Sequence, residues 1–130
     1  MVDILAPISV GELIDKITIL RIKRERIHAA PALANVAHEL DRLLEIRARA
    51  SLDAPDLAEL EEELFRVNGE LWEVEDQLRA LERSGNHGER FVELARSVYR
   101  LNDRRSLLKR RINAVTGSAI VEEKSYTSYE

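Results

Sequence analysis

Hydrophobic residues recur at alternating steps of three and four over two long stretches of the chain, residues 57–81 and 91–115. This spacing places them on one side of an α-helix, and its persistence predicts long helices at 55–83 and 89–115. The turn-forming stretch S-G-N-H-G separates the two, so we expect an antiparallel hairpin. Its apolar positions are Leu57, Leu60, Leu64, Val67, Leu71, Val74, Leu78 and Leu81, then Phe91, Leu94, Val98, Leu101, Leu108, Ile112 and Val115.

Two shorter helices are predicted before this hairpin, at 9–29 and 31–50. The first begins at an S-x-x-E capping pattern, and the second has Pro31 in its first turn. The middle of the first, I-T-I-L-R-I, is apolar nearly all round, because Ile19 and Ile22 lie off the main stripe. Such a helix is either central in a bundle or shared with a second subunit.

The expected fold is therefore all-α. It is a bundle of about four helices over residues 1–117, built round the long hairpin and followed by a C-terminal tail at 118–130. That tail either packs back in part or is disordered. The pattern leaves open whether the bundle closes within one chain or across a dimer axis.

Composition narrows the class of protein. The chain has no cysteine, which excludes disulfides and zinc-thiolate sites and suits a reducing compartment. Its N-terminus does not resemble a signal peptide, and no apolar run approaches the ~20 residues of a membrane span. A net charge of −4 argues against nonspecific nucleic-acid binding. We expect a cytoplasmic protein without a membrane span or a nucleic-acid partner.

Charge is unevenly divided between the two long helices. Residues 57–83 hold nine acidic and three basic residues, a balance of −6, whereas residues 89–115 hold eight basic and three acidic, a balance of +5. As neighbours, these helices attract each other. The basic run at 104–111 is interpreted as a solvated face paired with the acid-rich helix.

Polar residues interrupt the apolar pattern near the middle of both long helices. Asn68 and Glu75 lie between apolar strips of one helix, while Asn102 flanks the stripe of the other and Arg105 stands in it. An unpaired buried charge costs on the order of several kcal/mol, so we expect pairing across the hairpin, Glu75 with Arg105 or Asn68 with Asn102. One interpretation is a polar layer that fixes helix register and oligomeric state.

The alternative interpretation is a binding pocket. Arginine makes bidentate contacts to carboxylate or phosphate, and aromatic faces cover a ring. An anionic metabolite would then bind inside the bundle, between the hairpin and the first helix. The candidate residues are Asp15, Lys16, Trp72, Tyr99, Asn102 and Arg105.

Standard catalytic and cofactor signatures are absent from the sequence. The three histidines, His28, His38 and His87, are scattered, and no Glu-x-x-His pair occurs. There is no phosphate loop, dinucleotide fingerprint or serine-histidine-acid pattern. We therefore predict no metal site and no cofactor, and favour a protein that is not an enzyme.

Four segments resemble a family of small, uncharacterised bacterial helical proteins, a domain of unknown function. They are G-E-L-I-D-K-I-T-I-L at 11–20, E-L-W-E-V-E-D at 70–76, E-L-A-R-S-V-Y-R-L-N-D-R-R at 93–105 and E-E-K-S-Y at 122–126. The resemblance places Asp15, Lys16, Trp72, Glu75, Asp76, Asn102, Asp103 and Arg105 in the defining motifs. It also implies a link to surface-polysaccharide genes. A weaker resemblance, to the all-helical chorismate mutases, transfers no catalytic residue.

Two functions follow as hypotheses. The first is a non-catalytic interaction or oligomerisation module, a homodimer in which charge at Ile19 or Ile22 would dissociate the subunits. The second is a binder of, or small enzyme acting on, an anionic metabolite, in which Arg105→Ala would abolish binding and spare the fold.

Overall fold

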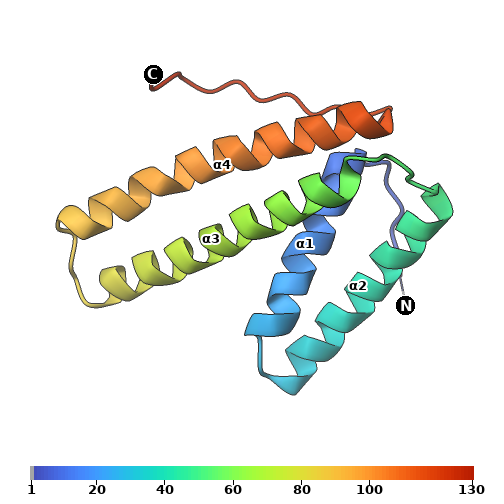
Figure 1. Cartoon of the computed structure of the whole chain (residues 1–130). Helices are drawn as coiled ribbons and strands as arrows, with labels where there is room; N and C mark the ends of the chain where they lie inside the picture. The colour runs from blue at the N-terminus through green and yellow to red at the C-terminus, as the bar shows by residue number, and fades with distance from the viewer. Residues whose placement is uncertain (1) are drawn as a thin grey trace.

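The chain folds into four helices, which the computed structural model shows for residues 2–130 (Figure 1). Their bounds are α1 Val10–Arg26, α2 Ala30–Ala50, α3 Leu57–Arg83 and α4 Glu89–Thr116. No strand occurs in the residues described. The predicted all-helical bundle is confirmed, and Met1, the first residue of the predicted domain, lies outside the described part.

Local chemistry sets the ends of the helices. The Ser9 hydroxyl accepts a hydrogen bond from the Glu12 amide at 3.0 Å, as the capping pattern predicts. The first helix ends three residues earlier than expected, because Ile27 is extended and its amide bonds to the Lys23 carbonyl at 2.9 Å. Gly117 closes α4 with a φ of 67°, a left-handed conformation that favours glycine.

Helix α1 lies at the centre of the molecule. It is the one described helix whose backbone packs against all three others, while the backbone of α2 packs against α1 and its Arg47 forms an ion pair with Glu61 of α3. Ile14 and Ile17 of α1 are fully buried, and Ile22 is 3% exposed. The central position of α1 in the bundle therefore accounts for its apolar middle. A charged residue in place of Ile22 would disrupt the fold of the single chain. The core it organises contains Leu13, Leu20, Val36, Leu40, Leu57, Leu64, Val67, Leu108 and Ile112.

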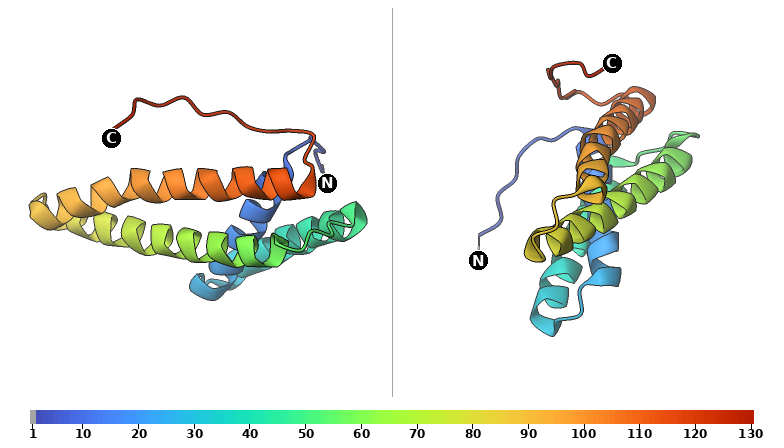
Figure 2. Two further views of the ribbon diagram at one scale, coloured as in Figure 1. Left: turned by 45° about the horizontal axis from the view of Figure 1, so that its top comes forward. Right: turned by 90° about the vertical axis from the view of Figure 1, so that its left-hand side faces the viewer.

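The α3–α4 hairpin extends well beyond α1 (Figures 1 and 2). Near α1, the apolar residues Leu64, Leu108 and Ile112 have no exposed surface. In the distal half of the hairpin, which we define as residues 71–101, Leu94 alone among the apolar stripe positions is buried. Half-buried positions there are Leu71, Val74, Leu78, Leu81, Phe91, Val98 and Leu101.

The tail, residues 118–130, has no helix or strand and runs back along α4 (Figure 2). The Ser118 hydroxyl accepts a hydrogen bond from the Val10 amide at 3.1 Å, which ties the start of the tail to the start of α1. Farther along, Arg110 and Glu123 form an ion pair at 3.3 Å. The tail therefore belongs to the folded structure and covers part of α4.

Candidate functional site

A buried carboxylate organises the junction of α1, α3 and α4. Asp15 of α1 has no exposed surface. Its two carboxylate oxygens accept hydrogen bonds from Nε and Nη2 of Arg105, at 2.9 and 2.5 Å. Asn68 of α3 donates to the same carboxylate at 2.9 Å. Such bidentate, charge-assisted contacts are strong and directional. They raise the pKa of the Arg105 guanidinium above its ordinary value, against the opposing effect of burial.

The α1 backbone completes this arrangement. Thr18, also fully buried, donates its hydroxyl to the Asp15 carbonyl at 2.8 Å and accepts from Asn68 at 2.9 Å. Every polar group brought into the apolar middle of α1 therefore finds a partner, which burial requires. We call Asp15, Asn68, Arg105 and the neighbouring Lys109 the ion layer.

The predicted pairing across the hairpin is wrong. Arg105 pairs with Asp15 of α1 instead of Glu75, and Asn68 also turns to Asp15. Glu75 lies 3.9 Å from Arg79 on its own helix. The physical reason is that α1 lies against the hairpin at this level and supplies a fully desolvated carboxylate, whereas Glu75 remains partly hydrated.

Lys109 joins the ion layer to the tail, and sequence reasoning missed it. Its ammonium lies 2.5 Å from Glu12, 3.5 Å from Glu122 and 3.9 Å from Asp15, and its side chain is only 12% exposed. The sequence pattern predicts a solvated basic face at this position, whereas the side chain is nearly buried. The signal available in the sequence was its spacing of four from Arg105, which places both cations on one side of α4.

Close packing of the α1 backbone on the α4 backbone fixes the position of α1 along α4. The Gly11 amide donates to the Asn113 side chain at 2.6 Å, and a Cβ at Gly11 would lie 2.6 Å from the Lys109 carbonyl oxygen. Only glycine permits this approach. Gly11, which the sequence analysis did not single out, therefore positions Asp15 against Arg105.

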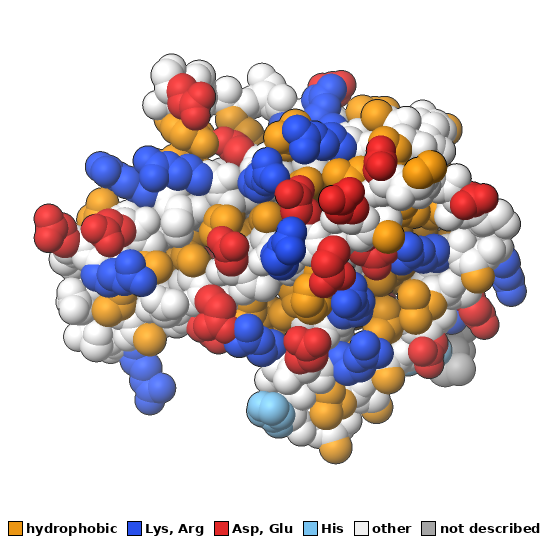
Figure 3. Space-filling view, viewed as in Figure 1, with side chains coloured by type: hydrophobic (Ala, Val, Ile, Leu, Met, Phe, Trp, Pro, Cys, Tyr) orange, Lys and Arg blue, Asp and Glu red, His pale blue; other side chains and the backbone are white. Residues whose placement is uncertain are grey.

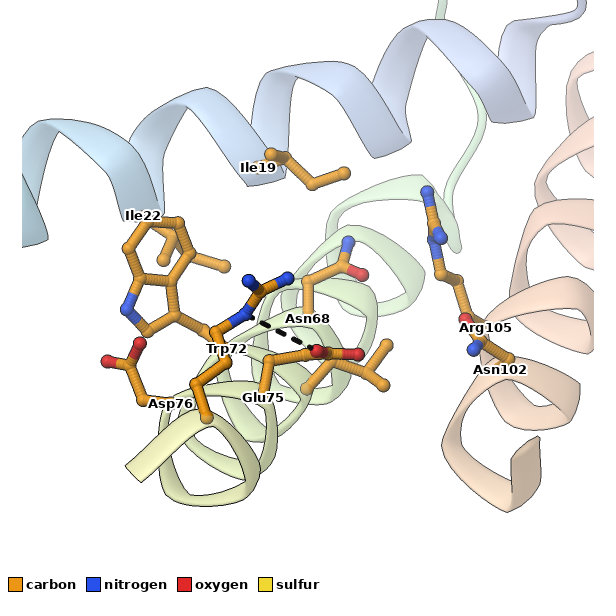
Figure 4. Close-up of a pocket in the computed structure, with 10 residues that line it drawn as sticks. Ile19, Ile22, Asn68, Trp72, Glu75, Asp76, Asn102 and Arg105 are labelled. Carbon is orange, nitrogen blue, oxygen red and sulfur yellow. Dashed lines mark ion pairs between the residues drawn. The ribbon is translucent and has the colours of Figure 1, made fainter. Parts of the chain in front are cut away.

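Beside the ion layer, a pocket of about 480 Å³ opens between α1, α3 and α4 (Figure 4). The Arg105 guanidinium points up toward α1, while Trp72, Glu75 and Asp76 lie together on α3 at the other side. The full lining consists of Ile19, Ile22, Asn68, Leu71, Trp72, Glu75, Asp76, Arg79, Asn102 and Arg105.

Acidic and basic side chains are equal in number in the pocket lining. Two donors of Arg105 already hold Asp15, and at the opposite wall the negative charges of Glu75 and Asp76 meet the positive charge of Arg79. A carboxylate that displaced Asp15 from Arg105 would leave Asp15 buried without its main partner, which costs on the order of 3–5 kcal/mol. The arrangement acts chemically as a structural clamp between helices.

Three of the ten predicted site residues lie elsewhere. Lys16 is 44% exposed and lies 3.9 Å from Glu12. Tyr99 and Asp103 face the tail, where Tyr129 packs edge-on against Tyr99 and donates its hydroxyl to Asp103 at 2.7 Å. The structure therefore divides the sequence-predicted site: Asn68, Trp72, Glu75, Asp76, Asn102 and Arg105 line the pocket, and Asp15 lies behind it.

No cluster of three or more potential ligand side chains is placed to hold a metal ion in residues 2–130. Among the helices described, none combines the length and apolarity needed to cross a membrane.

Comparison with protein families assigns the chain through nearly its whole length. A family model matches residues 4–129. The chain belongs to DUF6165, a family of unknown function. This agrees with the resemblance to a domain of unknown function. No curated protein and no solved structure matches the chain. Because the family has no known function, the proposal for this chain rests on the ion layer and the surfaces beside it.

Proposed function

We propose that this DUF6165 chain is a non-catalytic helical interaction module that forms a homodimer through the α3–α4 hairpin. The observation that carries this proposal is the half-buried apolar stripe in the distal half of the hairpin. Most of the stability of a helix in a protein comes from packing of its apolar face. Packing of the hairpin against two further helices completes a four-helix bundle.

The hairpin offers a face that no helix covers. Helix α1 packs on one side of α3 and α4, and α2 reaches the hairpin only through the ion pair of its Arg47 with Glu61 of α3. On the uncovered face lies a groove of about 480 Å³ at Leu60 and Val115, the latter 40% exposed. Figure 3 looks onto this face and shows hydrophobic side chains between charged ones along both helices.

The charge pattern of this face favours a second copy as its occupant. An acidic edge on α3, formed by Glu59, Glu63 and Glu70, follows steps of four and seven residues. A basic edge on α4, formed by Arg100, Arg104 and Arg111, follows the same steps. Glu63 and Arg104 contact each other at 3.0 Å, so the two edges lie side by side.

A two-fold axis parallel to the hairpin would lay each α3 over the partner's α4 at the same height. The acidic edge of one copy then meets the basic edge of the other, which is the self-complementarity that an isologous interface requires. No such match arises if α3 lies over its own counterpart, because two acidic edges would meet. The proposed dimer therefore has a defined orientation.

Charge reversal tests this arrangement without touching the core. The α3 variant carries Glu59→Arg and Glu70→Arg, and the α4 variant carries Arg100→Glu and Arg111→Glu, all at exposed positions. Light scattering should show a dimer for the wild type and monomers for each variant alone. An equimolar mixture should restore a dimer, because each reversed edge then meets its opposite.

The matched control is Glu39→Arg with Asp41→Arg, which changes net charge as the α3 variant does but lies on exposed positions of α2. This control should remain dimeric. A wild-type monomer at micromolar concentration refutes the proposal. So does a mixture of the two hairpin variants that stays monomeric while circular dichroism shows both folded.

We also place the module in the bacterial cytoplasm, without a nucleic-acid partner. The absence of cysteine and the net charge of −4 support this assignment. A connection with surface-polysaccharide biosynthesis rests on the sequence resemblance alone. The alternative function, binding or turnover of an anionic metabolite at the Arg105 cluster, is disfavoured by the engagement of Arg105 with Asp15.

A further inference from the structure

The tail and α4 form a second cavity, which is open to solvent and is lined by none of the residues of the proposed dimer face. It measures about 810 Å³ and lies between the tail and the middle of α4. The tail is anchored before the cavity by the ion pair of Glu122 with Lys109, and within the lining by the hydrogen bond from Tyr129 to Asp103. The cavity is lined by Tyr99, Asp103, Tyr126, Thr127, Ser128, Tyr129 and Glu130.

This lining is unusual for the chain in two respects. All three tyrosines of the sequence, Tyr99, Tyr126 and Tyr129, meet here, although they come from two separate segments. The only charged side chains of the lining are two carboxylates, those of Asp103 and Glu130. No lysine or arginine contributes to it, in a chain that holds 20 such residues.

The pKa of Tyr129 reflects the negative charge of this lining. The hydrogen bond to Asp103 is the main cause that raises the pKa of the Tyr129 phenol, and the charges of Asp103 and Glu130 act in the same direction. Arg100 opposes them only weakly. The cavity is therefore a region in which added negative charge is disfavoured.

Much of the surface of the three tyrosine side chains is exposed to solvent. Tyr99 is 41% exposed, Tyr129 is 49% exposed and Tyr126 is 78% exposed, so a ligand in the cavity would remove substantial aromatic surface from water. Aromatic faces attract cations through the ring quadrupole, and several rings beside a carboxylate form the arrangement that recognises quaternary ammonium groups. A neutral apolar ligand would gain the same burial but no electrostatic attraction.

We propose that the cavity between the tail and α4, with its three tyrosines and the Asp103 and Glu130 carboxylates, binds a small organic cation of the alkylammonium class. Tyr99 and Tyr129 provide the fixed walls, since their rings already pack at 4.8 Å and Asp103 holds the Tyr129 hydroxyl. Tyr126, which is 78% exposed, supplies the third ring of the lining. The site shares no lining residue with the proposed dimer face, although Arg100 of that face acts weakly on Tyr129.

Choline and its uncharged isostere, 3,3-dimethyl-1-butanol, provide a direct test, because they share shape and differ in charge. With only three tyrosines and two phenylalanines in the chain, the tyrosine ring signals are resolvable by NMR. Titration with choline should shift the signals of all three tyrosines, and the isostere should bind at least about fivefold more weakly. Sodium chloride at equal ionic strength controls for salt.

Variants locate the binding site. Tyr99→Leu, Tyr126→Leu and Asp103→Asn should each weaken choline binding about two- to fivefold, the size of one cation–π or exposed charge contact. Because Tyr126 is largely exposed, its replacement leaves the fold intact. Trp72→Leu is the matched control, since Trp72 also lies near carboxylates but in the other pocket.

Three results would overturn the proposal. Equal binding of choline and its isostere would show that charge plays no part. The absence of tyrosine shifts with choline would show that the cavity takes no such cation. Loss of binding in Trp72→Leu, with binding retained in Tyr126→Leu, would place the cation in the pocket beside the ion layer.

Discussion

Removing Arg105 should destabilise the fold more than removing its partner. Arg105→Met keeps most of the apolar stem but leaves the Asp15 carboxylate, 1% exposed, with Asn68 and the more distant Lys109. Stranding one member of a buried ion pair costs about 3–5 kcal/mol. Asp15→Asn instead leaves a guanidinium whose side chain is 30% exposed and can be hydrated. We expect about 3 kcal/mol for Arg105→Met and roughly half of that for Asp15→Asn.

Urea unfolding followed by circular dichroism measures both values. Protein concentration must be held constant, because dimerisation contributes to apparent stability. The double variant should cost less than the sum of the single variants by more than about 1 kcal/mol, since the two residues share one contact. A well-packed apolar replacement of both partners would approach wild-type stability.

The opposite order of effects would refute this reasoning. If Arg105→Met stays within about 0.5 kcal/mol of the wild type, as changes at uncoupled surface sites do, the ion layer has no structural role. A thermal shift of the wild type by phosphorylated or carboxylated metabolites, absent in that variant, would then establish the anion-binding hypothesis.

The remaining predictions concern close packing, the tail and Lys109. Gly11→Ala should destabilise the chain by about 2 kcal/mol or more, because the new Cβ meets backbone at 2.6 Å, whereas Gly69→Ala, with nothing within 4 Å, should stabilise it by about 0.5–1 kcal/mol in thermal unfolding. Asp103→Asn should lower the raised pKa of Tyr129, which absorbance at alkaline pH would detect. Because that pKa is raised in the folded state, the stabilising contribution of Tyr129 is complete below about pH 10 and is lost as pH rises through the folded value. Lys109→Met should loosen the tail as well as α1, which hydrogen exchange at residues 119–124 would report, whereas unchanged protection there would contradict its bridging role.

The helices were predictable because their signals are local. Ser9 caps α1 and Gly117 ends α4, and each signal lies within a few residues of the boundary it sets. The partner of Arg105 was not predictable in this way. Asp15 lies 90 residues away, and a helical wheel of α4 carries no information about where α1 crosses it. The close approach at Gly11 was hidden for the same reason, since it depends on two backbones that meet only after packing.

The central position of α1 also has a consequence for the order of folding. The contacts that secure it come from the far end of the chain, with Asp15 separated from Arg105 by 90 residues and Gly11 from Asn113 by 102. The α3–α4 hairpin, by contrast, closes over a short turn and can form early, since local contacts need little loop closure. During synthesis, α1, which has more buried residues than any other described helix, emerges before α3 and α4, and its core stays incomplete until residue 113 has been made. Until that moment α1 is the segment most exposed to aggregation or to a chaperone.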